Sequence, residues 1–373
     1  MMRLKGFVLG TLILFSYNLV AQNIRGVVLD AYTNQPIESA SVYFDNTTIG
    51  TSTNDKGEFE IQLKEGVTSA LVISFLGYEK VLLDTYNSKQ FYKIVLNESA
   101  DSLDEVVIYT DDGMPKAIKL QQFREQFLGF SKFAKSCMIL NEDALILRFD
   151  QDSKQLSVSA TEPVIVQNNS LQYQVNFDII DFVIDYSYID VLRGNYQIKS
   201  MLYSGTSFYK PLENDKPKQA EKNREQVYKG SVLHFMRALT NKRLKKDKYF
   251  IFSKGFRVDP NKYISVSEVG NTDSFNVKLR APLSVLYKRE FQSEIELPLG
   301  FKQKISEVTI TTNDTLKRTI QVKGSTSNAE PYYNVEFIVD SYGNYSPIDA
   351  FYFIGYMGNQ RVGDSLPFDY ELP

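Results

Sequence analysis

The stretch that decides the fold of the N-terminal part of this chain is Gly50-Thr51-Ser52-Thr53-Asn54-Asp55-Lys56-Gly57-Glu58-Phe59-Glu60-Ile61-Gln62-Leu63. Its second half alternates polar and apolar residues from Glu58 to Leu63, the pattern of a half-buried β-strand. Before that strand stands Asn54-Asp55-Lys56-Gly57, in which a glycine accepts the φ > 0 that closes a tight turn. The stretch therefore predicts a β-hairpin with Gly57 in the left-handed region.

Short strands of the same kind surround this stretch. The alternation of apolar residues predicts strands that begin at Ile24 and span residues 41–44 and 70–75, and Asn34-Gln35-Pro36 marks a further turn. Short strands at regular spacing with turn residues between them indicate a sandwich of roughly seven strands. Such a module is a scaffold and carries no catalytic groups of its own.

Several motifs of this segment recur together in one known family. They are Gly26-Val27-Val28, Asn34-Gln35-Pro36-Ile37, Ala40-Ser41-Val42, Gly50 to Phe59, and Ser74-Phe75-Leu76-Gly77-Tyr78, followed by Leu103-Asp104-Glu105-Val106-Val107-Ile108. The segment resembles the carboxypeptidase regulatory-like family, which implies a transthyretin-like fold. Residues 103–108 look like the segment that follows this domain in many outer-membrane proteins. In metallocarboxypeptidases the domain is an accessory beside the zinc enzyme, so the resemblance implies no peptidase activity.

The first 21 residues have the pattern of a secretory signal peptide. Arg3 and Lys5 precede an apolar run from Phe7 to Phe15, and Leu19-Val20-Ala21 ends it with a small residue. The alternative, a transmembrane anchor, is disfavoured because the run is shorter than the roughly 20 residues that a bilayer requires. The absence of Cys near the cleavage point disfavours a lipoprotein anchor. We therefore expect export, with cleavage after Ala21, and no transmembrane span in the mature chain.

The composition fits an exported, β-rich protein. The chain has 24 Tyr and 25 Phe but no Trp, and its net charge of −3 gives no footprint for nucleic acid or a membrane surface. One cysteine, Cys137, excludes an intramolecular disulfide. We expect Cys137 to be a buried small hydrophobic residue. A reactive thiol would be the alternative, and it would need a partner histidine.

The sequence changes character after residue 110. Residues 111–143 form a linker with a bridging helix, whose residues Ile118, Phe123, Phe127 and Phe130 recur at roughly helical intervals. From residue 144 to 373 strands dominate, and we expect a larger antiparallel β-meander domain. One helix is inserted there, opened by the polar stretch 214–226 and carrying its apolar face at 227–239. The fold class is thus mainly β, with domains at 22–110 and 144–373.

Three blocks of the larger region also resemble known sequences. Residues 127–141, 224–239 and 363–370 look like blocks of uncharacterised exported proteins of one Gram-negative phylum, in which they follow the same regulatory-like domain. That resemblance carries no established chemistry. It implies architecture and an envelope location only.

The chain lacks the residues that most catalytic sites require. A zinc carboxypeptidase needs two His and a Glu on the metal, and this chain has a single histidine, His234. We expect His234 to be a packing or surface residue; a general base is the alternative, with Ser231 three residues away but no nucleophile elbow around it. Phosphate-binding glycine motifs are also absent from the sequence. We therefore predict no catalytic residues, no metal ligands and no cofactor.

Carboxylates are the remaining residue type that could carry catalysis in this chain. Asp178, Asp181, Asp185 and Asp190 fall in one stretch, but in an extended chain Asp178 points away from Asp181 and Asp185. We expect solvent-facing residues there, with a calcium or carbohydrate site as the alternative. The basic residues Lys242, Arg243, Lys245, Lys246 and Lys248 follow a helix and offset its dipole. Contact with lipid phosphate or polysaccharide is the alternative for them.

These observations favour a non-enzymatic binding or assembly module of the bacterial cell envelope. We expect an accessory of an outer-membrane complex, in the periplasm, at the outer membrane or at the cell surface. Its partner would be an envelope protein, with carbohydrate also open and nucleic acid excluded. Edge strands of the small sandwich could accept a partner's strand by main-chain pairing. A carboxylate-dependent hydrolase or binder of surface glycans or peptides is the second class, and a passive structural component of the envelope the third.

Overall fold

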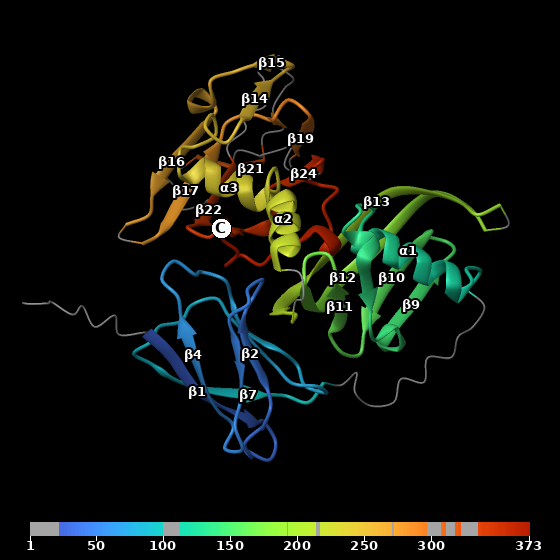
Figure 1. Cartoon of the computed structure of the whole chain (residues 1–373), viewed down its shortest axis with the longest axis vertical. Helices are drawn as coiled ribbons and strands as arrows, with labels where there is room; N and C mark the ends of the chain where they lie inside the picture. The colour runs from blue at the N-terminus through green and yellow to red at the C-terminus, as the bar shows by residue number, and fades with distance from the viewer. Residues whose placement is uncertain are drawn as a thin grey trace, which may run out of the picture.

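Figure 1 shows a computed structural model of the chain, which is mainly β. It describes residues 22–99, 112–191, 193–213, 217–270, 272–296 and 335–373, together with the backbone of β20 (Glu307–Ile310) and β21 (Arg318–Gln321). The predicted signal peptide and the motif at 103–108 lie outside the described residues. The buried hydrophobic residues of the described part gather in three cores, which we call the sandwich core, the middle core and the third core.

The N-terminal body is a β-sandwich of two sheets. One sheet has the order β4-β1-β7 and consists of β1 (Gln22–Asp30), β4 (Glu58–Leu63) and β7 (Phe91–Leu96). The other has the order β3-β2-β5-β6 and consists of β2 (Ser41–Phe44), β3 (Gly50–Ser52), β5 (Leu71–Ser74) and β6 (Val81–Leu83). Fully buried Ile24, Phe44 and Ile73 are part of the core between the sheets. The predicted β-sandwich is confirmed.

The turn at residues 54–57 is present, but it does not make a hairpin. The Gly57 N–H donates to the carbonyl of Asn54 at 2.9 Å, and Gly57 has φ of +70°, as predicted. However, β3 pairs with β2 while β4 pairs with β1, so the turn carries the chain from one sheet to the other. The hairpin prediction was wrong because alternation identifies a strand without identifying the strand that pairs with it.

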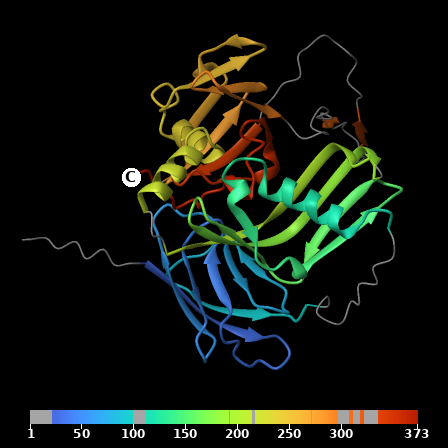
Figure 2. The ribbon, with the colours of Figure 1, turned by 45° about the vertical axis from the view of Figure 1, so that its right-hand side comes forward.

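The middle body is a six-stranded sheet covered by a helix. The sheet contains β8 (Cys137–Ile139), β9 (Leu145–Asp150), β10 (Gln155–Ala160), β11 (Val164–Asn168), β12 (Tyr173–Asp190) and β13 (Asn195–Pro211). Helix α1 (Lys116–Leu128) lies across one face (Figure 2). Its buried Phe123 and Phe127 meet Phe182 and Phe177 edge to face, at centroid distances of 4.9 and 5.1 Å. This aromatic contact anchors the helix that the sequence predicted within residues 111–143.

The third body joins two helices to two small sheets. One sheet runs β15-β14-β18-β19-β24, with β14 (Tyr249–Ser253), β15 (Phe256–Arg257), β18 (Leu283–Tyr287), β19 (Phe291–Glu296) and β24 (Tyr352–Gly355). The other runs β16-β17-β22-β23, with β16 (Ile264–Glu268), β17 (Ser274–Leu279), β22 (Val335–Asp340) and β23 (Tyr345–Ser346). Short 3₁₀ turns lie at Ala134–Ser136, Glu142–Ala144, Pro260–Lys262, Ile348–Ala350 and Val362–Asp364.

The inserted helix predicted around residues 214–239 is two helices. Helix α2 spans Pro217–Tyr228 and α3 spans Val232–Thr240. Between them Gly230 has φ of +90°, and a Cβ there would lie 2.7 Å from the ring of Tyr287. Ser231 then caps α3 by accepting a bond from the His234 N–H. The sequence analysis assigned residues 227–239 to one apolar face, and the structure divides them: Val227 and Tyr228 join the middle core, whereas Phe235, Met236 and Leu239 join the third core.

The two larger cores do not follow the chain in simple order. Residues of α1 and of β9–β13 build the middle core, and the segment with Val362, Leu366 and Tyr370 returns to it. The third core takes residues between Phe235 and Met357. The predicted domain boundaries at 110/111 and 143/144 stay a prediction. The returning segment lies where all three bodies meet.

Replacement of Gly57 by Ala should destabilise the sandwich. A Cβ at this position would lie 2.5 Å from the Val28 carbonyl oxygen, and φ of +70° is strained for alanine. The strain alone costs about 1–2 kcal/mol, so we expect a clear fall in the first thermal unfolding transition of the full chain. Gly77→Ala is the matched control, because Gly77 has φ of +83° but its added Cβ would have no atom within 4 Å. Equal effects of the two changes would contradict a packing role for Gly57.

Candidate functional site

The sandwich docks on the middle sheet through the turn after β2, residues Asp45–Thr48. The Asn46 N–H donates to the carbonyl of Ser207 at 2.7 Å, and the Tyr209 N–H donates to the carbonyl of Thr47 at 3.0 Å. These bonds use the outer edge of β13, on the side away from β12. The side chain of Asp45 accepts from the Ser207 N–H at 2.7 Å. The sandwich is thus attached by backbone pairing, and we call this contact the docking turn.

Three carboxylates of the larger bodies reach into the sandwich. Asp340 accepts from the Thr68 hydroxyl at 2.8 Å, and Asp369 accepts from the Thr48 N–H at 2.9 Å. Asp178 forms an ion pair with Lys80 at 2.8 Å. Hydrogen bonds to a charged acceptor are the stronger kind. The contacts come from the third body, the returning segment and β12, so they fix the orientation of the sandwich from three sides.

Arg237 of α3 holds the returning segment against the docking turn. Its guanidinium donates to the carbonyls of Phe368, Tyr370 and Tyr342 at 2.6, 2.7 and 2.9 Å. On the opposite side of the same segment, the Phe368 N–H donates to the carbonyl of Asn46 at 2.6 Å. The rigid fork of arginine suits such a set of acceptors. Residues 368–370 therefore lie between α3 and the sandwich, and we call this arrangement the junction.

Burial raises the pKa of two carboxylates that hold the sandwich, Asp45 in the docking turn and Asp340, which binds Thr68. Desolvation raises the pKa of Asp45 to about 6, against the bonds from the backbone N–H groups of Ser207 and Asn46 that favour its charged form. Desolvation also raises the pKa of Asp340, whose side chain is almost fully buried. Burial disfavours the charged form of an acid, which is the cause in both cases.

A pocket of about 320 Å³ opens beside the junction. Its lining includes Tyr173, Glu221, Arg224, Asp369 and Tyr370. The guanidinium of Arg224 lies 4.1 Å from the centre of the Tyr173 ring and donates to the carbonyls of Leu171 and Gln172. Asp369 is likewise engaged with Thr48. Arg224 and Asp369 are therefore engaged in contacts that stabilise the fold.

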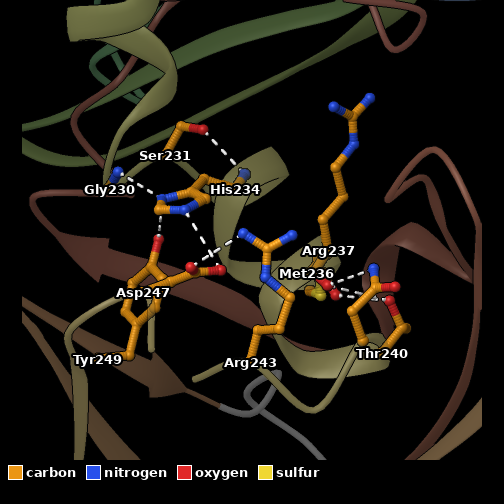
Figure 3. Close-up of polar contacts among 10 residues, drawn as sticks. Gly230, Ser231, His234, Met236, Arg237, Thr240, Arg243, Asp247 and Tyr249 are labelled. Atoms are coloured by element: carbon orange, nitrogen blue, oxygen red, sulfur yellow. Dashed lines mark hydrogen bonds and ion pairs between the residues drawn. The ribbon is translucent and has the colours of Figure 1, made fainter. Parts of the chain in front are cut away.

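His234 lies in a buried cluster at the start of α3 (Figure 3). Its Nδ1 accepts a bond from the Gly230 N–H at 3.1 Å and therefore carries no proton. The hydroxyl of Tyr249, 2.9 Å from the same nitrogen, must then also be a donor. The ring proton then sits on Nε2, which lies 3.8 Å from Asp247. Desolvation lowers the pKa of His234 to about 4, although Asp247 acts in the opposite direction. The imidazole is neutral at physiological pH.

Ser231, His234 and Asp247 contain the residue types of a catalytic triad, but not its geometry. The Ser231 hydroxyl oxygen accepts from the backbone N–H of His234, which is a helix cap. Nδ1 of the imidazole already accepts two bonds, and Asp247 also pairs with Arg243 at 3.1 Å. A general base needs a free ring nitrogen beside the nucleophile. The cluster therefore joins α3 to β14, and the sequence analysis missed Asp247 and Tyr249 because neither stands in a motif.

Cys137 is partly buried against the middle core. Its thiol donates a weak bond to the carbonyl of Phe133 at 3.5 Å, and burial raises its pKa to about 12. The thiolate, which is the reactive form, is therefore scarce at neutral pH.

The acidic stretch is arranged differently from the prediction. A bulge at Ile180 shifts the register of β12 against β13. Before the bulge the odd-numbered residues 173, 175 and 177 are buried, and after it the even-numbered residues 182, 184 and 186 are buried. Asp178, Asp181 and Asp185 consequently share the face that points away from the core. The prediction that Asp178 opposes the other two was wrong, because strict alternation fails across a bulge.

Sharing a face does not make these carboxylates a catalytic pair. Asp178 is bound to Lys80, Asp181 accepts from Ser204 at 3.1 Å, and Asp185 accepts from Gln155 and Ser200 at 2.9 and 2.7 Å. The bonds from Gln155 and Ser200 lower the pKa of Asp185, whereas a general acid needs a raised pKa. Asp190 lies at the strand end beside Arg193, 3.8 Å away.

Lys242, Arg243, Lys245, Lys246 and Lys248 are exposed after α3. Within the described residues no group of three or more His, Cys, Asp or Glu side chains could hold a metal ion. The helices in the described part of the chain fall short of the length and apolar character that crossing a bilayer requires.

Two comparisons with known proteins concern the sandwich. Residues 24–108 match the model of the CarboxypepD_reg-like domain family, which confirms the resemblance for this segment. A curated protein, the TonB-dependent receptor SusC of Bacteroides thetaiotaomicron, is 34% identical over 98 residues. That match covers 26% of this chain and 9% of the receptor. The chain is therefore similar to the receptor over one module of a much longer protein.

We expect the imidazole of His234 to stay neutral well below pH 6.5. Since it is the only histidine of the chain, its NMR signals can be followed without assignment. The titration midpoint should lie near pH 4, because burial opposes the charged form. The unfolded chain takes up this proton at about pH 6.5, so the folded state loses up to about 3 kcal/mol of stability as the pH falls from 6.5 to 4. A midpoint near 6.5 would show that the ring is solvated.

Asp45 should make docking weaker at neutral pH than in mild acid. Its pKa is raised to about 6, so between about pH 4 and 6 the folded protein holds a proton that the unfolded chain has released. The stability of the wild type relative to Asp45→Asn should therefore fall as the pH rises from 4 to 6 and then level off. Thermal unfolding at several pH values measures it. The exposed Asp143→Asn is the control, and a pH-independent difference for Asp45→Asn would contradict the prediction.

Proposed function

We propose that this chain is a non-enzymatic binding or assembly module of the bacterial cell envelope and an accessory of an outer-membrane complex. The observation that carries the proposal is the sandwich itself. It matches a regulatory-like domain family, the chain is similar to part of a TonB-dependent receptor, and the sandwich is held here on the rest of the chain by backbone bonds. We place the mature protein, after export, in the periplasm, at the outer membrane or at the cell surface.

The sandwich keeps an exposed face after docking. Docking uses residues 45–48, Thr68 and Lys80, whereas the outward face of β7 carries Phe91 and Val95, which are 61% and 41% exposed. Figure 1 shows β1 and β7 on the side away from the other two bodies. Contiguous exposed apolar surface rimmed by polar residues is typical of protein interaction sites. A module that is docked on one side and free on the other suits a bridging role.

A carboxylate-dependent hydrolase or binder of surface glycans or peptides is the second candidate. The bulge at Ile180 favours it to the extent that Asp178, Asp181 and Asp185 face the same way. Their bonds to Lys80, Ser204, Gln155 and Ser200 argue for a structural role instead. We therefore propose that the chain acts through binding and carries no catalytic residue, metal or cofactor.

Photo-cross-linking in the producing bacterium tests the proposal. A photoreactive side chain placed at Phe91 or at Leu202, both exposed, should give an adduct with an outer-membrane protein in the membrane fraction. Phe256, 77% exposed in the third body, is the control position and should give no such adduct.

The hydrolase predicts a different result. Purified protein would then degrade an envelope glycan or peptide, and Asp181→Asn together with Asp185→Asn would abolish that turnover. Such turnover, with no adduct at Phe91 or Leu202, would overturn the proposed function.

A further inference from the structure

The outer edge of β13 is only partly used by the docking turn. Ser207 and Tyr209 direct their backbone groups outward and bond to Asn46 and Thr47. From residue 200 to 211 β13 pairs with β12 without skipping a residue, so the bulge at Ile180 leaves its alternation intact. Met201, Tyr203 and Gly205 must then also direct their N–H and C=O groups outward. Among the described residues no strand pairs with this part of the edge.

This free edge lacks the features that usually protect an edge strand. Such strands are commonly short, or carry Pro or several charged residues. β13 is 17 residues long, and Lys199 is the only charged residue between Asn195 and Tyr209. Leu202 is 53% exposed on the outer face. The β12–β13 hairpin also reaches away from the sandwich, as Figures 1 and 2 show.

We propose that residues 200–205 of β13 accept an extended strand of a partner protein, and that this strand carries a basic residue on either side of an apolar one on its outer face. The inference rests on the proposed binding function and assigns it a surface. The new strand would continue, along the same edge, the backbone pairing that the docking turn begins at Ser207. Strand addition of this kind takes its affinity from main-chain bonds and its specificity from alternate side chains.

The charges of the neighbouring strand define the partner. Asp181 lies opposite Ser204 and Asp185 lies opposite Ser200, with Leu202 between the two serines on the same face. A strand added to β13 would run about 10 Å from β12, across two strand spacings. Lysine or arginine side chains can extend over the small serines toward both carboxylates. An apolar residue between them would cover Leu202.

The molecule already contains one such contact. On this same acidic face the sandwich places Lys80 against Asp178 at 2.8 Å. Asp181, the next carboxylate along, has no cation within ion-pair distance among the described residues, and only Ser204 is bonded to it. The proposed partner would supply cations that pair with Asp181 and Asp185, as Lys80 pairs with Asp178. This charge pattern favours a basic extended strand over a second copy of β13, whose two cations, Lys199 and Lys210, lie eleven residues apart and cannot flank a single apolar residue.

Peptide binding to the full-length protein tests the proposal. The probe is an acetylated and amidated peptide, Thr-Val-Lys-Thr-Val-Thr-Lys-Val. Hydrogen exchange should show that it protects the amides of Met201, Tyr203 and Gly205. Two N-methylated versions of the peptide separate strand pairing from other binding. Methylation of the alternate amide nitrogens that face β13 should abolish binding, and methylation of the amide nitrogens that face away should leave it intact. Asp181→Asn with Asp185→Asn should weaken binding about three- to tenfold, whereas Asp143→Asn should leave it unchanged.

Two outcomes would overturn the proposal. Protection at β7 or β4 instead of β13 would place the strand on the sandwich, and protection of residues 201–205 without peptide, rising with protein concentration, would assign the edge to a second copy. Because this experiment uses purified protein and a synthetic probe, its failure is distinct from a failure of the cross-linking test. An adduct at Phe91 without peptide binding would keep the envelope function and remove this surface.

Discussion

The segment Phe368–Tyr370 is the physical link on which the arrangement of the three bodies depends. Arg237 binds the carbonyls of Phe368 and Tyr370, while Asp369 between them binds Thr48 of the sandwich. One short extended segment therefore presents backbone acceptors to α3 and a carboxylate to the sandwich. Because every one of these groups is polar and partly buried, leaving one unpaired costs more than the bond itself contributes. The contact specifies one orientation.

That constraint decides which surfaces remain for a partner. The docking turn occupies the end of the β13 edge at residues 207–209, and Lys80 neutralises Asp178. What docking leaves uncovered is the rest of that edge, the exposed Asp181 and half-buried Asp185, and the outward face of β7. The binding proposals therefore rest on what docking leaves free. His234 has no part in these proposals, because its ring is packed between aromatic side chains and its bond to Tyr249 links α3 to β14.

Local patterns in the sequence predicted most strands because each pattern depends only on near neighbours. Residues 41–44 and 58–63 were predicted as strands and form β2 and β4 with the same bounds. Gly57 was predicted to have positive φ, and it does. The errors arose wherever a distant partner decides. β4 pairs with β1 across the sandwich, and the break at Gly230 reflects close packing against Tyr287, which lies on β18.

By itself the sequence determined the mainly β class, the regulatory-like sandwich at residues 24–108 and the shortage of catalytic residue types, since composition and short motifs suffice for these. The tertiary structure alone decided the junction, the neutral buried state of His234 and the common face of Asp178, Asp181 and Asp185. Each of those depends on a contact between distant residues or on one inserted residue in a strand. Alternation along a single chain carries no information about such contacts, because strand pairing and burial are properties of the whole packed molecule.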